Sequence, residues 1–183
     1  MVTVRLVQVG PVPKAILAAL DGTVNEMLGC AAEIEQDVLD PSFAYDPARE
    51  QYNSTAILKI LEVTHAGDSG RILGVSELDL FIPILTYVFG EAFLNRPPAV
   101  ISLHRLHPQF YGLPKDPALS LQRAQTEAVH ELGHTFGLIH CSDYACVMHA
   151  SRVADEIDLK GPGFCSVCAA HLKSQHLSPR PYG

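Results

Sequence analysis

Residues 130–141 read His-Glu-Leu-Gly-His-Thr-Phe-Gly-Leu-Ile-His-Cys, an H-E-x-x-H-x-x-G-x-x-H motif followed at once by a cysteine. Side chains four residues apart lie on the same face of a helix, so His130 and His134 can offer two imidazole nitrogens to one metal ion. Gly137 can take the left-handed conformation that ends a helix and reverses the chain, which brings His140 back as a third ligand. Three histidine ligands leave one tetrahedral position open, as is typical of a catalytic zinc site.

Glu131 follows the first histidine and is rotated from it by about 100° around the helix, so its carboxylate can reach water in the open position. The metal acidifies this water and polarises a carbonyl, while the carboxylate takes the proton and later passes it to the leaving amine. The motif therefore predicts peptide-bond hydrolysis with Glu131 as general base. The alternative is an amphipathic helix that carries its histidines by chance, and the spacing of the glycine and the third histidine argues against it.

Four of the five cysteines, Cys141, Cys146, Cys165 and Cys168, form a C-x4-C pair and a C-x2-C pair. Two short-spaced cysteine pairs match a closed tetrahedral zinc site with a structural role. A disulfide pair and an iron–sulfur or iron–thiolate centre are the alternatives, because cysteine ligation alone does not select the metal. Successive side chains of an extended segment point to opposite sides, so His140 and Cys141 can serve different ions. We therefore expect two zinc ions per chain, one catalytic and one structural.

The composition is that of a compact domain: 183 residues, 48% of them hydrophobic and 18% charged. The formal net charge of -7 and the lack of a Lys/Arg cluster argue against nucleic acid and anionic membrane as partners. Residues 1–10 lack the basic start of a signal peptide, and no apolar run approaches the roughly 20 residues that span a bilayer. We expect a monomeric, cytoplasmic protein, in which clustered cysteines serve as metal ligands rather than disulfides.

The rest of the chain predicts a mixed α/β fold with a sheet of about five strands. Strands are expected at 2–9, 31–39, 71–76, 86–89 and 99–103. Helices are expected at 13–28, 54–64 and 117–136, the last one opened by an Asp116 cap and a proline in its first turn. Residues 40–53 are expected to be a loop, since prolines and other turn formers interrupt them.

Several single residues carry narrower expectations. Gly133 costs about 1 kcal/mol of helix propensity relative to alanine, so we expect a close packing contact at its backbone. Cys30 is expected to be a small buried hydrophobe. The remaining histidines are interpreted as surface or loop residues; they are His65, His104, His107, His149, His171 and His176.

On these residues the sequence resembles the metzincin metallopeptidases and, more narrowly, the archaemetzincins. The metzincin motif matches at His130, Glu131, His134, Gly137 and His140. The archaemetzincin extension matches at Cys141, Cys146, Met148, Cys165 and Cys168. The resemblance implies a mixed five-stranded sheet backed by two helices, with an active-site helix below it and a small C-terminal subdomain across a cleft. It also implies that Met148 is the methionine of the Met-turn, a tight turn beneath the catalytic metal.

We therefore expect one metallopeptidase domain over residues 1–183. Its N-terminal subdomain (1–137) would hold the active-site helix, and its C-terminal subdomain (138–183) the four-cysteine zinc site and the Met-turn. The expected substrate is a peptide or protein bound in extended form along an edge strand of the sheet, for which residues 86–93 are the candidate.

Two other functions remain as alternatives. One is a zinc-stabilised peptide-binding or regulatory protein whose three-histidine site is catalytically idle. Glu131 argues against it, because a mere binding site has no need of a base beside two ligands. The other is a nucleic-acid-binding zinc ribbon, against which the acidic composition argues.

Overall fold

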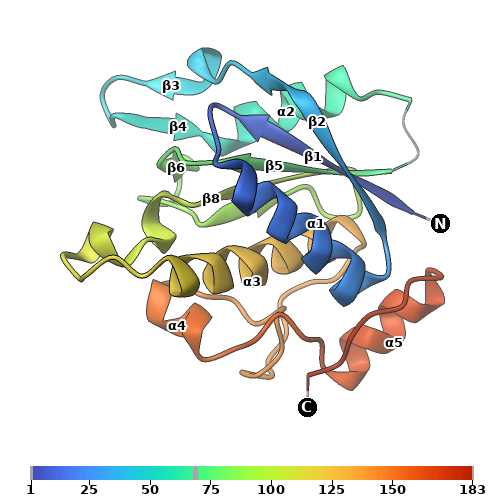
Figure 1. Ribbon diagram of the computed structural model, residues 1–183. Helices are drawn as coiled ribbons and strands as arrows, with labels where there is room; N and C mark the ends of the chain where they lie inside the picture. Colours follow the sequence, from blue (N-terminus) through green and yellow to red (C-terminus); the bar gives the residue numbers. More distant parts are fainter. Residues whose placement is uncertain (1, 68–69, 183) are drawn as a thin grey trace.

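The computed structural model describes residues 2–67 and 70–182 and has a mixed α/β fold (Figure 1). Its main sheet has five strands in the order β2-β1-β5-β8-β7. These strands are β1 (Thr3–Val9), β2 (Ala31–Leu39), β5 (Arg71–Ser76), β7 (Gly90–Ala92) and β8 (Pro98–Ser102). Neighbouring strands from β2 to β8 are parallel, whereas β7 pairs antiparallel with β8 at the edge. The mixed five-stranded sheet is thus confirmed.

Three long helices cover this sheet: α1 (Lys14–Leu28), α2 (Ser54–Thr64) and α3 (Pro117–Thr135). Strand side chains alternate between the two faces, so each face has its own apolar cluster. On β1, Val4 and Leu6 belong to the cluster that contains α1 and α3 residues. Val7 and Val9 belong to the cluster of α2 on the opposite face. The sheet therefore lies between α2 and a layer formed by α1 and α3.

Most predicted elements agree with the structure to within one residue at each end. The confirmed segments are the strands predicted at 2–9, 31–39, 71–76 and 99–103 and the helices predicted at 13–28, 54–64 and 117–136. Helix α3 begins as expected, because the Asp116 side chain accepts a 2.9 Å hydrogen bond from the Leu119 amide.

The strand predicted at 86–89 is wrong. This segment is irregular and makes only an isolated antiparallel bridge between Val88 and Leu80, and the edge strand β7 begins after it. The apolar residues alternate here because they pack on two sides: Phe89 belongs to the cluster of α1 and α3, whereas Val88 packs against the cluster of α2. The Tyr87 hydroxyl donates to the Arg152 carbonyl at 2.8 Å. Only the Phe89 carbonyl continues the pairing with β8, where it accepts from the Ser102 amide at 2.7 Å. The rest of the segment turns toward the C-terminal part of the chain.

Residues 40–53 are also more ordered than the predicted loop. They contain β3 (Tyr45–Asp46) and β4 (Gln51–Asn53), which form a separate three-stranded sheet with β6 (Leu80–Phe81). Strands of two or three residues are too short to show an alternating pattern, so no periodicity marks them in the sequence. The short 3-10 helices of the chain are Ser42–Ala44, His104–Leu106 and Pro108–Tyr111.

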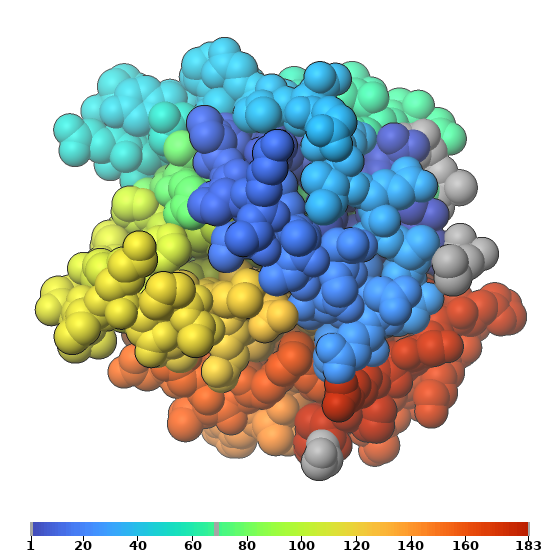
Figure 2. Space-filling view, viewed as in Figure 1, coloured from blue at the N-terminus to red at the C-terminus, as the bar shows by residue number. Residues whose placement is uncertain are grey.

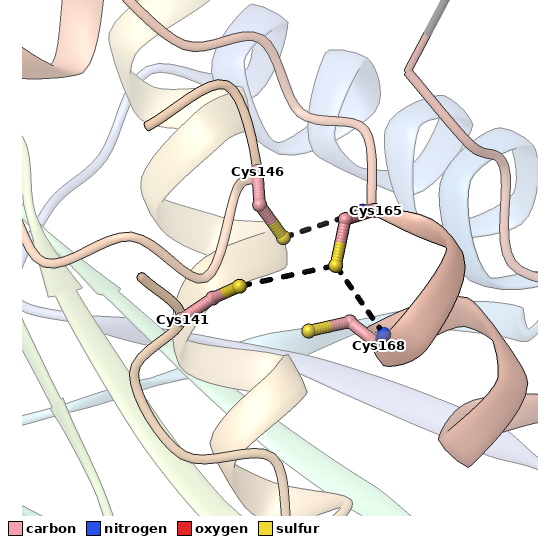
Figure 3. A group of neighbouring side chains, drawn as sticks. All are labelled: Cys141, Cys146, Cys165 and Cys168. Atoms are coloured by element: carbon pink, nitrogen blue, oxygen red, sulfur yellow. Dashed lines mark hydrogen bonds between the residues drawn. The ribbon is translucent and has the colours of Figure 1, made fainter. Parts of the chain in front are cut away.

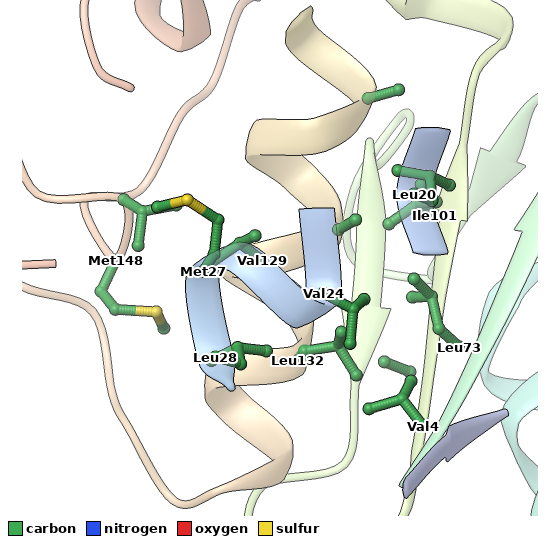
Figure 4. Packing of buried hydrophobic residues seen from close by; sticks show 14 of the residues in the cluster. Val4, Leu20, Val24, Met27, Leu28, Leu73, Ile101, Val129, Leu132 and Met148 are labelled. Carbon is green, nitrogen blue, oxygen red and sulfur yellow. The ribbon is translucent and has the colours of Figure 1, made fainter. Parts of the chain in front are cut away.

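Beyond α3 the chain forms mostly loops, with the short helices α4 (Ala154–Asp158) and α5 (Ser166–Ser174). Figure 1 places this segment on the side of α3 away from the sheet. Its side chains Met148, Phe164 and Leu172 belong to the same apolar cluster as α1 and α3, part of which Figure 4 shows. One core therefore joins the segment after α3 to the sheet domain.

The C-terminal tail returns to the end of α1, where the Ser178 amide donates to the Leu28 carbonyl and the Arg180 amide to the Met27 carbonyl. Figure 2 shows this contact as red tail atoms against the blue of α1. Among the described residues, no helix combines the length and the apolar character that crossing a membrane requires.

Candidate active site and metal centres

Helix α3 and the chain reversal after it bring three histidines together. One ligand atom each from His130, His134 and His140 lies within 4.8 Å of the others. The Nε2 atoms of His130 and His134 are 3.1 Å apart. The reversal occurs at Gly137, whose φ of 86° lies in the left-handed region that favours glycine. The geometry therefore follows from one helical turn, which separates His130 from His134, and from the chain reversal at Gly137.

Backbone carbonyls orient two of these rings. The Nδ1 atom of His130 lies 2.7 Å from the Val147 carbonyl, and that of His134 lies 2.7 Å from the Leu138 carbonyl. A carbonyl can only accept, so each Nδ1 carries the hydrogen and each Nε2 keeps a free lone pair. Burial lowers the pKa of His130 well below its usual value and also lowers the pKa of His134 and His140. Neutral rings with converging Nε2 atoms fit a zinc ion.

Glu131 lies buried beside these rings and directly against the edge strand. Burial, with the negative charges of Glu127 and Glu91, raises the pKa of the Glu131 carboxyl well above its ordinary value. A zinc ion beside it would lower that pKa again, because an opposite charge favours the carboxylate. Gly90 of β7 leaves room for this side chain, since a Cβ at residue 90 would lie 2.6 Å from Cγ of Glu131.

Two cavities meet at the three-histidine site. The larger, about 470 Å³, lies between α3 and the segments 85–90 and 150–152 and is lined by His130, Glu131 and His140. The second, about 380 Å³, shares these three residues and continues past His134 along β7 to Leu94. The site thus lies within an elongated depression that follows the edge strand.

The four cysteines form the second group (Figure 3). Their sulfurs all lie within 4.8 Å of one another, and those of Cys141 and Cys165 are 3.8 Å apart. Tetrahedral zinc with Zn–S bonds of about 2.3 Å would place two sulfurs about 3.8 Å apart. Backbone amides donate to the sulfurs, from Cys165 to Cys146 at 3.3 Å and from Cys168 to Cys165 at 3.4 Å. Such amides favour thiolates, so this donor set also fits zinc.

Met148 links the two groups. Its carbonyl accepts a hydrogen bond from the Cys141 amide at 2.9 Å, and its side chain contacts Gly133 of α3. The close packing contact expected at this glycine is therefore confirmed. Cys141 belongs to the four-cysteine group and directly follows His140 of the three-histidine group. The turn at Met148 therefore contacts the chain where the two groups adjoin.

In the described part of the chain, the remaining histidines join neither group. His107, for example, contacts Glu77 and Ser120, and His65 contacts Glu35. Cys30 is fully buried and lies outside the four-cysteine group, as expected.

Sequence reasoning missed one feature of the site, a buried ion pair between Lys160 and Glu127. Glu127 shares a face of α3 with His130 and His134, which the helical period does reveal. Lys160 lies in a loop 33 positions later, and no motif or period marks it.

The fold and the site together define a zinc-dependent metallopeptidase. The family model described as peptidase family M54 matches residues 24–174. The archaemetzincin of Methanocaldococcus jannaschii is 41% identical, with 92% of each chain covered. That of Pyrococcus furiosus is 36% identical over 93% of this chain and 92% of the relative. The chain therefore belongs to peptidase family M54, the archaemetzincins.

Solved structures agree with this assignment. The zinc-dependent peptidase from Methanocorpusculum labreanum has a TM-score of 0.85 and 29% identity, covering 92% of this chain and 99% of that one. The archaemetzincin from Methanopyrus kandleri has a TM-score of 0.81 and 36% identity, covering 96% and 95% respectively.

Proposed function

We propose that the protein hydrolyses peptide bonds with a catalytic zinc ion held by His130, His134 and His140 and with Glu131 as general base. Such an ion, when bound, lowers the pKa of a water molecule and polarises the carbonyl of the substrate. The observation that carries the proposal is the placement of Glu131, whose buried carboxylate lines the same cavities as the histidines. A site that only held metal would not require a carboxylate there.

In this proposal the chain's own residues bind the peptide and move one proton. On its side away from β8, β7 pairs with no strand among the described residues, so this edge can bind an extended peptide. Gly90 allows Glu131 to approach this strand closely. Glu131 would accept the proton of the attacking water and pass it to the leaving amine. The cavity of about 470 Å³ would receive a side chain next to the cleaved bond.

A second zinc ion, held by Cys141, Cys146, Cys165 and Cys168, would have a structural role. The short separation of the four sulfurs supports it. The proposal thus comprises two ions per chain, a catalytic subdomain at 1–137 and a C-terminal subdomain at 138–183. Anchoring Cys141 would also restrain His140, because the two residues are adjacent.

A monomeric state, a cytoplasmic location and the lack of a nucleic-acid partner remain proposals. The net charge of -7 supports the last of these. Reduced thiols, which the four-cysteine site requires, support the cytoplasmic location.

The test is Glu131→Gln, compared with the unchanged chain on a peptide library and by zinc analysis. We expect both proteins to hold two zinc ions and only the unchanged chain to cleave peptides. Equal cleavage by the two proteins would show that Glu131 is not the base. Lack of cleavage by a fully zinc-loaded unchanged chain, with a library that covers all side-chain classes, would favour the idle binding protein.

A further inference from the structure

The buried ammonium group of Lys160 donates hydrogen bonds to both sides of the turn at Met148. The side chain of Lys160 is only 1% exposed, although lysine is one of the residues least often buried. Its Nζ donates to the Val147 carbonyl at 2.9 Å and to the His149 carbonyl at 2.5 Å. These carbonyls belong to the two residues that flank Met148. One side chain therefore holds both sides of the turn.

The charge of this ammonium is balanced from the active-site helix. Oε1 of Glu127 lies 3.7 Å from Nζ of Lys160, and the Glu127 side chain is 5% exposed. This oxygen has no hydrogen-bond partner among the described residues. A buried charge without a counter-charge is costly, so each member of the pair requires the other. Glu127 lies four residues before Glu131 on the same face of α3. Through its ion pair with Glu127, Lys160 connects the turn at Met148 to this face of the helix.

The Val147 carbonyl also connects Lys160 to a metal-binding ring. It accepts from Nδ1 of His130 at 2.7 Å as well as from Lys160 at 2.9 Å. A carbonyl oxygen has two lone pairs and can serve both donors. The position of this oxygen sets the tautomer and the orientation of the His130 ring. Whatever holds the carbonyl therefore also holds the ring.

The second carbonyl lies close to the other ligands. Nδ1 of His149 contacts the Cys141 carbonyl at 2.9 Å, and Cys141 directly follows His140. Lys160 thus restrains, through His149, the backbone at the third histidine. No other side-chain cation among the described residues donates to the carbonyls of Val147 or His149.

We propose that Lys160 is a positioning residue for the three-histidine site. It fixes the carbonyls on both sides of Met148, so that His130 presents Nε2 in the orientation that zinc requires, and Glu127 serves as its buried counter-charge. The inference rests on the proposed function only in that the three histidines hold zinc. It differs from a purely structural role, in which Lys160 would stabilise the fold without changing the affinity for zinc.

The test is zinc affinity, measured by competition with a chromogenic chelator on the full chain. Lys160→Met keeps an unbranched apolar side chain, one atom shorter than that of lysine, and removes its charge and donors. Loss of such an outer partner typically weakens metal binding by about 10- to 100-fold, and we expect a loss in that range at the three-histidine site. Zinc at the four cysteines should be retained. Lys115→Met, at an exposed position, is the matched control and should bind zinc as the unchanged chain does.

A double variant separates the carbonyl contacts from the charge balance. Glu127→Gln combined with Lys160→Met leaves no unpaired buried charge but still lacks the ammonium donors. We expect the double variant to bind zinc at the three-histidine site at least roughly tenfold more weakly than the unchanged chain, which is the lower end of that range. Recovery of the unchanged chain's affinity would overturn the proposal, because Lys160 would then only neutralise Glu127. The single variant Lys160→Met gives a second criterion. If its zinc affinity lay within about threefold of that of the unchanged chain, the loss would be well short of the expected one and the proposal would be wrong.

If Lys160→Met does not fold, Lys160→Gln replaces it. Its side chain is one bond shorter and cannot reach both carbonyls, so weaker zinc binding is again expected and unchanged binding would overturn the proposal. The His130 ring Nδ1–H signal in protein labelled with 15N-histidine gives an independent measurement, and it should shift in either variant. These measurements do not depend on peptidase activity. A chain that binds zinc without cleaving peptides would contradict the proposed function and leave this inference intact.

Discussion

Met148 packs directly on Gly133, so that a Cβ at residue 133 would collide with the Met148 sulfur. Both residues are buried, and Met148 is fully so. A side chain at position 133 would therefore force the buried Met148 side chain to move. Gly133 lowers the intrinsic stability of α3, but it allows Met148 to approach the helix closely.

Gly133→Ala should destabilise the protein although alanine is the better helix former. The gain in helix propensity is about 1 kcal/mol, whereas overpacking of a filled core typically costs about 1–3 kcal/mol. Denaturant unfolding of the zinc-loaded protein measures the difference. Gly22→Ala in α1 is the matched control, because a Cβ there would meet nothing within 4 Å, and it should stabilise. If both variants gained stability equally, the contact with Met148 would be unimportant.

Gly90→Ala should impair catalysis without removing the metal. A Cβ at residue 90 would lie 2.7 Å from Oε1 of Glu131, so the carboxylate must move. A displacement of about 1 Å at a reacting group can lower the rate by about 100-fold. We expect a fall of this order in kcat/KM at unchanged zinc content. Gly161→Ala, where a Cβ has open space, should remain fully active. Full activity of Gly90→Ala would argue against Glu131 as the base.

Acid should remove the two ions in separate steps. Burial lowers the pKa of the three histidines, so below their ordinary value of 6.5 the unfolded chain takes up protons that the folded chain does not. Their contribution to folding stability therefore falls as the pH falls through this window, and protons displace zinc from Nε2. His140 is exposed, whereas three of the four cysteines are buried.

The ion at the histidines should accordingly leave first. Metal analysis of dialysed samples, taken at decreasing pH, measures the zinc that remains. A single step in which both ions leave together with the loss of near-UV circular dichroism would contradict independent sites.

The parts of this molecule that sequence predicts well depend on residues close together in the chain. Helix α3 carries its own cap, its apolar stripe and two histidines four residues apart, so one periodicity determines its ends and its functional face. The features that sequence did not reveal depend on distant partners. Segment 86–89 resembles a strand, but Tyr87 is bound to the Arg152 carbonyl, 65 positions away. The role of Lys160 cannot be predicted from its neighbours in sequence, because it depends on the fold that places its side chain beside Glu127.

Cys168→Ser should weaken the three-histidine site although residue 168 is not part of it. The substitution leaves three sulfur ligands, and the zinc-binding free energy that the four-cysteine site contributes to folding is partly lost. In zinc-finger peptides this binding amounts to about 10–16 kcal/mol. Cys141 would then be less restrained, and so would its neighbour His140. We expect a lower melting temperature, fewer than two zinc ions per chain and peptidase activity reduced by about tenfold or more.

The three quantities should be measured on one preparation of Cys168→Ser, since the coupling predicts that they change together. Cys30→Ala is the control, because it removes a buried cysteine that lies outside the four-cysteine group. A cavity at residue 30 lowers stability through packing alone and should leave both ions and the activity of the folded protein unchanged. Mild chelation gives a further contrast, because it should empty the exposed histidine site of the unchanged chain before the buried cysteine site. If Cys168→Ser kept full activity with zinc only at the histidines, the two sites would be independent and the structural ion would not position His140.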